Sequence, residues 1–170
     1  MATLPVTPQD IERRVREVLD SLGVDYEWMP CDPDFADTAA FCAKYGIAPD
    51  ISANTIVVAS RRGEPAYCAC VVLATTRLDV NNVVRRLMGV PKASFAAAEE
   101  TVAITGMMIG GVTPFALPDT LPLYVDAAVM QRERVVTGAG SRSAKVMLPP
   151  DALRRLPNAS VIDGLARAHA

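Results

Sequence analysis

The chain carries two apolar runs close together, NTIVVAS at residues 54–60 and AYCACVVLA at residues 66–74. Both are typical of β-strands, and the short polar segment RRGEP between them contains glycine and proline. This combination predicts a β-hairpin. Because both faces of the second run are apolar, we expect it to be a central strand that is covered on two sides.

Helical patterns and further strands surround this hairpin in an irregular order. Ile11, Val15 and Leu19 recur at helical spacing between Thr7-Pro8 and Gly23, which are helix start and stop signals. Other helices are expected near residues 38–45, 80–88, 96–105 and 151–156, and strands at 24–29, 121–125, 135–137 and 145–148. Several connections are too short for a parallel crossover, so the pattern predicts a mixed α/β fold with much antiparallel pairing.

Length and composition set broad limits on the class of protein. No linker-like shift or internal repeat divides the 170 residues, so we expect one domain over residues 1–170. The net charge of -2 argues against nonspecific binding to duplex DNA but leaves contact with one end of a nucleic acid open. The longest uncharged stretch, residues 101–118, contains glycines and prolines that would break a membrane-spanning helix. No secretory signal is visible, so we expect a cytoplasmic protein without a membrane partner.

The cysteines and the single histidine limit the kinds of catalytic and metal site that the chain can form. Cys31, Cys42, Cys68 and Cys70 form no C-x-x-C pair, and we expect them to be reduced and buried. The alternative is a redox or nucleophilic role for Cys68 or Cys70. His169 lies next to last, so histidine triads and histidine-ligated zinc sites have no candidate inside the domain. We expect neither a metal nor a cofactor.

The most unusual segment is GMMIGGVTPFALP at residues 106–118. Gly110 and Gly111 leave backbone N–H groups unobstructed, and Pro114 stiffens the following turn. Such a loop can aim amides at a developing negative charge, as an oxyanion site requires. The alternative is a tight turn between a helix and a strand. The segment matches neither a Walker loop nor G-x-G-x-x-G, so nucleotide phosphate binding is disfavoured.

Polar residues at two further places are candidate ligand-binding groups. In the turn GAGSR, residues 138–142, Ser141 and Arg142 could together hold a phosphate or a carboxylate. The alternative is a hairpin loop with solvated polar residues. Asp126 ends the apolar strand at residues 121–125, where its carboxylate either faces a cleft or caps the next segment.

The segments GGVTPFALP, LPLYVD and VVTGAGSRSAKVMLPP resemble, in order and approximate spacing, the YbaK/EbsC family. This family includes free-standing aminoacyl-tRNA deacylases and the editing domain inserted in bacterial prolyl-tRNA synthetases. The match is specific over residues 106–149 and weaker from about residue 7 to residue 165. The resemblance implies a mixed α/β fold in which a curved, mostly antiparallel and partly barrel-like sheet, flanked by helices, surrounds a small pocket.

The resemblance also implies a trans-editing activity that protects translation fidelity: hydrolysis of the ester between a wrong amino acid and the 3′ acceptor end of a tRNA. In the family the G-x-x-x-P loop, here Gly110 to Pro114, lies against the ester, and a ribose hydroxyl of the substrate assists. The implied partners are the aminoacyl-tRNA acceptor end and an aminoacyl-tRNA synthetase. The expected catalytic residues are Gly110, Gly111, Pro114 and Asp126, and the expected substrate-binding residues are Asn54, Thr55, Thr113, Ser141 and Arg142.

One residue departs from the family pattern. Family members commonly have a lysine that contacts the tRNA terminus where this chain has Asn54. Loss of a charge pair at about 4 Å amounts to roughly 4 kcal/mol at an effective dielectric near 20. The candidates to replace this charge are Arg61, Arg62, Arg77 and Arg142. The departure supports an alternative hypothesis, a non-catalytic module that binds tRNA or an amino-acid-like ligand.

Overall fold

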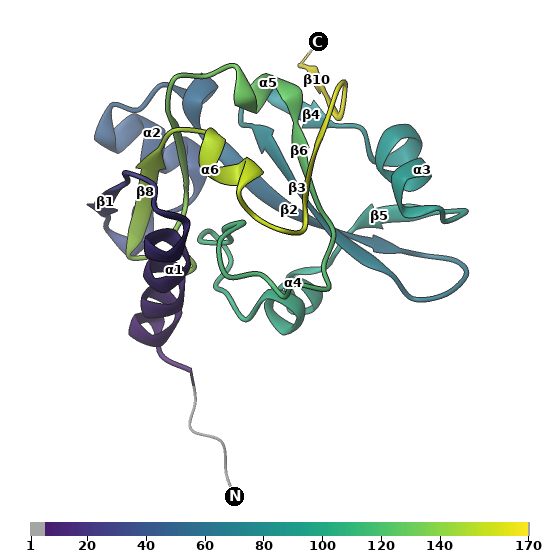
Figure 1. Cartoon of the computed structure of the whole chain (residues 1–170), viewed down its shortest axis with the longest axis horizontal. Helices are drawn as coiled ribbons and strands as arrows, with labels where there is room; N and C mark the ends of the chain where they lie inside the picture. The colour runs from purple at the N-terminus through teal and green to yellow at the C-terminus, as the bar shows by residue number, and fades with distance from the viewer. Residues whose placement is uncertain (1–5, 170) are drawn as a thin grey trace, which may run out of the picture.

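The computed structural model describes residues 6–169 and arranges its strands in three sheets. The largest sheet crosses the centre of the molecule in the order β5-β2-β3-β6-β9 (Figure 1). Its strands are β5 (Ala93–Phe95), β2 (Ala53–Ser60), β3 (Tyr67–Leu73), β6 (Leu123–Asp126) and β9 (Ala159–Ile162). A mixed α/β fold is therefore confirmed.

The predicted hairpin forms the middle of this sheet. Strands β2 and β3 pair antiparallel from Ala53↔Leu73 to Ala59↔Tyr67. On its other side β3 pairs in parallel with β6, and every residue of β3 after Tyr67 is buried. The prediction of a central strand covered on both faces is therefore confirmed.

Two smaller sheets complete the strand arrangement. One has the order β1-β8-β7, with β1 (Glu27–Pro30), β8 (Ala144–Leu148) and β7 (Val135–Gly138), and the other joins β10 (Ala166–Ala168) to β4 (Thr76–Leu78). Both ladders of the β1-β8-β7 sheet and the β10–β4 ladder are antiparallel, and among the ladders of the described residues β3–β6 and β6–β9 are the parallel ones. A single bridge, Ser52↔Val136, links β7 to the start of β2. Within residues 6–169 the strands do not close into a barrel.

Helix α1 (Pro8–Leu22) is the longest helix and follows the predicted pattern. Thr7 and Asp10 form a capping box at its start, Gly23 ends it in the left-handed conformation, and Ile11, Val15 and Leu19 are buried. The shorter helices are α2 (Thr38–Tyr45), α3 (Arg85–Met88), α4 (Ala98–Thr105), α5 (Ala127–Met130) and α6 (Asp151–Arg154), with 3-10 turns η1 (Pro33–Phe35) and η2 (Pro49–Ile51). No helix of the described residues is both long and apolar enough to cross a membrane.

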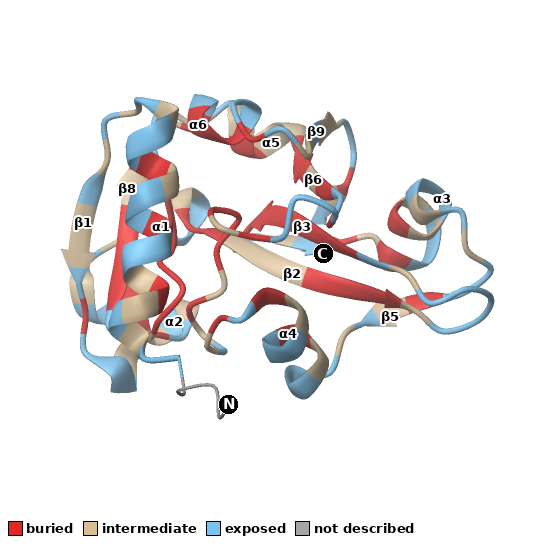
Figure 2. Ribbon diagram, turned by 60° about the horizontal axis from the view of Figure 1, so that its bottom comes forward, coloured by how far each residue is buried: buried red, intermediate tan, exposed pale blue. Residues whose placement is uncertain are grey.

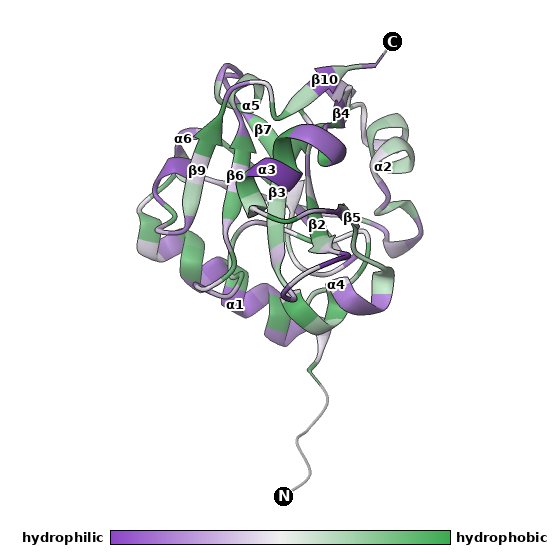
Figure 3. Ribbon diagram, turned by 90° about the vertical axis from the view of Figure 1, so that its right-hand side faces the viewer, coloured by the Kyte–Doolittle hydropathy of each residue, from purple (hydrophilic) through white to green (hydrophobic). Residues whose placement is uncertain are grey.

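The five-stranded sheet separates two hydrophobic cores. Side chains alternate along a strand, so Val71 of β3 enters the core beneath α1, and its neighbours Cys70 and Val72 enter a second core with Val84 and Leu165. Figure 2 shows the buried residues concentrated along these central strands, and Figure 3 shows the same strands as mainly hydrophobic beside the hydrophilic α3. The first half of β2 is only partly buried, in contrast to its second half.

The thiol alternative has an unfavourable environment. Cys68 and Cys70 are buried in the second core with their Sγ atoms 4.0 Å apart. The contact with Cys68 and the burial raise the pKa of the Cys70 thiol well above its ordinary value. A thiolate, which is the reactive form, is therefore strongly disfavoured at Cys70.

Some expected elements differ in extent or type. The helix expected over residues 80–88 begins as a π-helical segment, η3 (Val80–Val84), before it continues as α3. The strand expected at residues 24–29 is shifted to β1. The three-residue strands β4, β5 and β10 were not predicted, since so short a strand shows no clear alternation of apolar and polar residues.

Candidate functional site

The site begins where strand β2 has an uncovered edge. Strand β5 pairs with β2 only from Val58 to Ser60, and just beyond it Ala96 N donates to Val57 O over 2.9 Å. Backbone groups of alternate residues point to the same edge of a strand, so the amide and carbonyl of Thr55 face this edge as well. Strand β5 has already ended there, so these Thr55 groups can meet a ligand.

A cavity of about 360 Å³ lies along this edge. Residues of β2, of β8 and of the segment 106–118, here called the glycine loop, line it, together with Thr38 and the segment after β5. Its lining contains hydroxyl, amide and ammonium groups but no carboxylate or imidazole. The lining residues are Thr38, Ala53, Asn54, Thr55, Ile56, Val57, Phe95, Ala96, Thr101, Ile109, Gly110, Val112, Gly138 and Lys145.

The glycine loop packs directly on the GAGSR turn through backbone atoms. Met108 N donates to Gly140 O over 2.9 Å, and Gly140 N donates to Gly111 O over 2.7 Å. A Cβ on Gly111 would collide with the backbone of Ser141, so only glycine allows this approach. The Gly111 amide donates to Met108 O over 2.9 Å, so it is not a free donor for a ligand.

Of the predicted loop residues, only Gly110 lines the cavity. Its φ of +90° suits glycine, and a Cβ there would meet Arg142. Thr113 and Pro114 are buried beneath the loop, and Thr113 N donates to Met107 Sδ over 3.4 Å. Thr113 and Pro114 therefore support the loop from behind and do not line the cavity.

Lys145 of β8 is a cavity residue that the sequence reasoning missed. Its relative exposure is only 7%, and its Nζ donates to Gly110 O over 2.7 Å. The same Nζ lies 5.6 Å from the centre of the Phe41 ring, and no carboxylate of the described residues forms an ion pair with it. Burial lowers the pKa of Lys145. The signal in the sequence was a lone lysine in the apolar strand that follows GAGSR.

Asn54 and Thr55 both line the cavity. Asn54 Oδ1 accepts a hydrogen bond from Thr38 Oγ1 over 2.8 Å. Thr55 Oγ1 is buried and has no hydrogen-bond partner among the described residues. An unsatisfied buried hydroxyl costs free energy, so a ligand that bonds to Thr55 would remove that cost.

Ser141 and Arg142 lie outside the cavity and hold loops together. Ser141 is fully buried, and its Oγ donates to Glu12 Oε1 of α1 over 2.6 Å. Arg142 donates to Pro33 O through Nε and Nη2, and to Asp37 Oδ1 and Ile109 O through Nη1, over 2.8–3.1 Å. These contacts leave Arg142 as a clamp between the glycine loop and the segment before α2, with no group aimed at the cavity.

Asp126 also lies away from the cavity. It is 3% exposed at the end of β6, near backbone N–H groups of Ala166, Leu165 and Ala127 that favour its charged form. Burial outweighs their effect and raises the pKa of the carboxyl group. Neither alternative expected from the sequence is met, because Asp126 does not line the cavity and makes no side-chain hydrogen bond that caps the next segment, α5.

The four arginines considered as replacements for the missing lysine do not line this cavity. Arg61 pairs with Glu100 over 3.0 Å, and Arg77 lines a separate groove. The positive charge beside Asn54 therefore comes from Lys145.

Comparison with known proteins assigns the class. Residues 32–156, well over half of the chain, match the aminoacyl-tRNA editing domain family. The chain belongs to this family, and the resemblance to YbaK/EbsC proteins is confirmed.

Individual relatives agree with this assignment. The chain is 32% identical over 94 residues to the uncharacterized protein YwhH of Bacillus subtilis (strain 168), a match that spans 55% of this chain and 59% of that protein. The crystal structure of hypothetical protein APE2540 superimposes with a TM-score of 0.79 at 28% identity, covering 91% of this chain and 99% of that one. A proposed trans-editing enzyme for prolyl tRNA synthetase gives a TM-score of 0.75 at 25% identity, covering 96% and 99%.

The close approach of the two loops predicts a large cost for a methyl group at Gly111. Gly111→Ala is expected to destabilise the fold by about 2 kcal/mol or more, because a backbone clash with Ser141 cannot be relieved by a side-chain rotation. Gly106→Ala is the control, since its Cβ would meet nothing and only the positive φ costs about 1 kcal/mol. Urea unfolding followed by circular dichroism measures both; equal losses in the two variants would contradict the packing argument.

The Arg142 clamp predicts an acid-sensitive ion pair. Hydrogen bonding to Arg142 lowers the pKa of Asp37, so the pair contributes stability above the ordinary Asp pKa of about 3.9. This contribution is lost as the pH falls through the lowered pKa. NMR titration of the carboxyl carbons should place the Asp37 midpoint below the ordinary Asp value and move it upward in Arg142→Met.

Asp10 is the internal control for this titration. Its pKa is lowered by Thr7 in the α1 capping box and should stay low in Arg142→Met. An Asp37 midpoint that Arg142→Met leaves unchanged would rule out the clamp.

Proposed function

We propose that the chain hydrolyses the ester between a wrongly attached amino acid and the 3′ end of a tRNA. The observation that carries this proposal is the cavity on the uncovered β2 edge. It is lined by Thr55, by Gly110 of the glycine loop and by the buried Lys145. Membership of the aminoacyl-tRNA editing domain family supports it. A volume of about 360 Å³ is at the small end for ligand sites and suits an aminoacyl group with part of a ribose.

In the proposed reaction, the oxygen of a water molecule bonds to the acyl carbon while negative charge develops on the carbonyl oxygen. The Lys145 ammonium group and the Thr55 amide are the donors that stabilise this charge. The bond between the acyl carbon and the ribose oxygen then breaks, and that oxygen takes up a proton. No carboxylate or imidazole lines the cavity, so the proton from the water passes to the substrate hydroxyl or to solvent.

Lys145 supplies the positive charge that the family pattern places at position 54, where this chain has Asn54. In the family pattern the lysine opens the strand that is β2 here, whereas this chain has Asn54 on β2 and a lysine on β8, and both residues line the cavity. We infer that the positive charge of the site is supplied from β8 instead of β2. The charge beside the ester is then retained although the family position lacks it.

The proposed setting follows from the substrate. The tRNA acceptor end is the partner, in the cytoplasm, where aminoacylation takes place. The likeness to the proposed trans-editing enzyme for prolyl tRNA synthetase makes tRNAs charged by that synthetase the first substrates to test.

A second candidate is a non-catalytic module that binds tRNA or an amino-acid-like ligand. It is favoured by the Gly111 amide, which is used within the loop and cannot act as an oxyanion donor. The test that separates the two is a panel of mischarged tRNAs. Release of free amino acid at catalytic protein concentration supports the hydrolase, whereas saturable binding without release over the whole panel supports the module.

Moving the positive charge of the cavity from β8 to β2 tests the role of Lys145. Lys145→Met should lower kcat/KM on the best tRNA substrate by about 10² to 10³-fold, the usual cost of losing one preorganised donor. Adding Asn54→Lys to that variant should recover at least about tenfold, because an ammonium group then enters the same cavity from β2. Single-turnover deacylation measures both.

The control is Lys92→Met, which removes an exposed lysine and should leave the rate unchanged. Thermal unfolding should remain cooperative in Lys145→Met, since removal of a buried cation without an acidic partner costs little stability. Full activity in Lys145→Met would refute the assigned role.

A further inference from the structure

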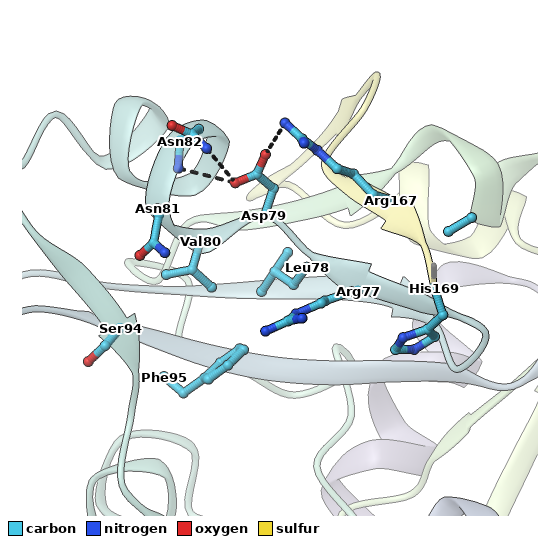
Figure 4. Close-up of a pocket in the computed structure, with 11 residues that line it drawn as sticks. Arg77, Leu78, Asp79, Val80, Asn81, Asn82, Ser94, Phe95, Arg167 and His169 are labelled. Atoms are coloured by element: carbon cyan, nitrogen blue, oxygen red, sulfur yellow. Dashed lines mark hydrogen bonds and ion pairs between the residues drawn. The ribbon is translucent and has the colours of Figure 1, made fainter.

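A second hollow lies on the other side of β5 from the cavity. It has a volume of about 590 Å³ and is bounded by the β4–β10 pair, by η3 and by Ser94 and Phe95 of β5 (Figure 4). We refer to it as the β4–β10 groove. Phe95 lines both the groove and the cavity, so the two hollows meet at this one side chain.

The groove carries two arginines at paired positions, and their side chains reach different partners (Figure 4). Arg77 of β4 and Arg167 of β10 are partners in the antiparallel ladder, so their side chains leave the same face. Arg167 is paired with Asp79 over 2.9 Å, whereas Arg77 forms no ion pair with any described residue. Arg77 is therefore the cation of the groove that an anion would bind.

The remaining polar groups of the groove favour an anionic ligand too. The one carboxylate of the lining, Asp79, is already held by Arg167 and by the amides of Asn82. His169 adds an imidazole ring, and Figure 4 shows it beside Arg77 at one end of the groove. This local excess of cations stands out in a chain whose net charge is -2.

The exposed ring of Phe95 indicates which class of anion the groove would bind. Its relative exposure is 54%, unusual for a large apolar side chain, and Figure 4 shows it across the groove from the Arg77 side chain. Aromatic rings interleaved with cations are the usual means of binding single-stranded nucleic acid, because bases stack on the rings while cations bind the phosphates. A small inorganic anion would have no use for the ring.

We propose that the β4–β10 groove binds the unpaired nucleotides that precede the terminal nucleotide of an RNA 3′ end. Phe95 stacks a base at the junction of the two hollows, and Arg77 binds a phosphate. This inference rests on the proposed function for the direction of the strand, since the terminal nucleotide then enters the cavity.

The test measures binding of a 5′-fluorescent single-stranded RNA hexamer ending in CCA and carrying no amino acid, by anisotropy at several salt concentrations. Phe95→Ala should weaken binding by about 5- to 100-fold, the range for loss of one stacked base. Arg77→Glu should weaken binding and reduce the slope of log affinity against log salt by about 0.7 for each phosphate that is no longer bound. Arg77→Glu should unfold at about the same temperature as the unmodified chain, because Arg77 is exposed and forms no ion pair with a described residue.

Two matched controls address nonspecific effects. Arg14→Glu makes the same change in net charge on exposed α1, and Val102→Ala truncates another exposed apolar residue, which is 44% exposed. Both should bind the hexamer within about twofold of the unmodified chain. Equal weakening by control and groove variants would overturn the proposal, as would the absence of saturable binding by the unmodified chain. A polyaspartate peptide bound with the same dependence on Phe95 would also overturn it.

The outcome is separable from that of the proposed function. If no mischarged tRNA is hydrolysed but hexamer binding depends on Phe95 and Arg77 as predicted, the groove proposal is supported and the hydrolase proposal fails. If tRNA esters are hydrolysed but groove variants bind the hexamer as the unmodified chain does, the groove proposal alone fails.

Discussion

Backbone contact between two loops is the constraint on which the site depends. The glycine loop and the GAGSR turn exchange hydrogen bonds between Met108, Gly111 and Gly140, and their main chains approach so closely that a Cβ on Gly111 or Gly138 would collide with the opposite loop. This contact fixes the position of Gly110 above the β2 edge. It also brings Gly110 O within 2.7 Å of Lys145 Nζ, so the wall of the cavity and its charge are set together.

The cavity combines two features that a stable core would avoid. Strand β5 ends before it covers the first half of β2, which leaves the backbone of Thr55 without a neighbouring strand on that side. Lys145 is buried without an acidic partner among the described residues, although burial of a charge is costly. Both features cost stability and both point into the same small volume, as expected for a site that binds a polar ligand.

The strong local patterns predicted the fold well, and the site only in part. The hairpin of β2 and β3 and helix α1 follow from alternation and helical spacing within one segment. Lys145 could not be placed in this way, because the pattern of β8 does not reveal which element packs opposite it. Ser141 and Arg142 were expected to bind substrate, yet their partners are Glu12 and Pro33, 129 and 109 residues away in the chain. Such long-range contacts leave no periodic signal in the sequence.

The central claim is that an acyl ester binds at the β2 edge between Thr55, Gly110 and Lys145. Amide chemical shifts recorded during titration with a non-hydrolysable aminoacyl-adenosine analogue test it most directly. The account predicts saturable shifts at Thr55, Gly110 and Val112, and none at Asp126. Saturable shifts confined to other parts of the chain, with these three amides unmoved, would contradict it.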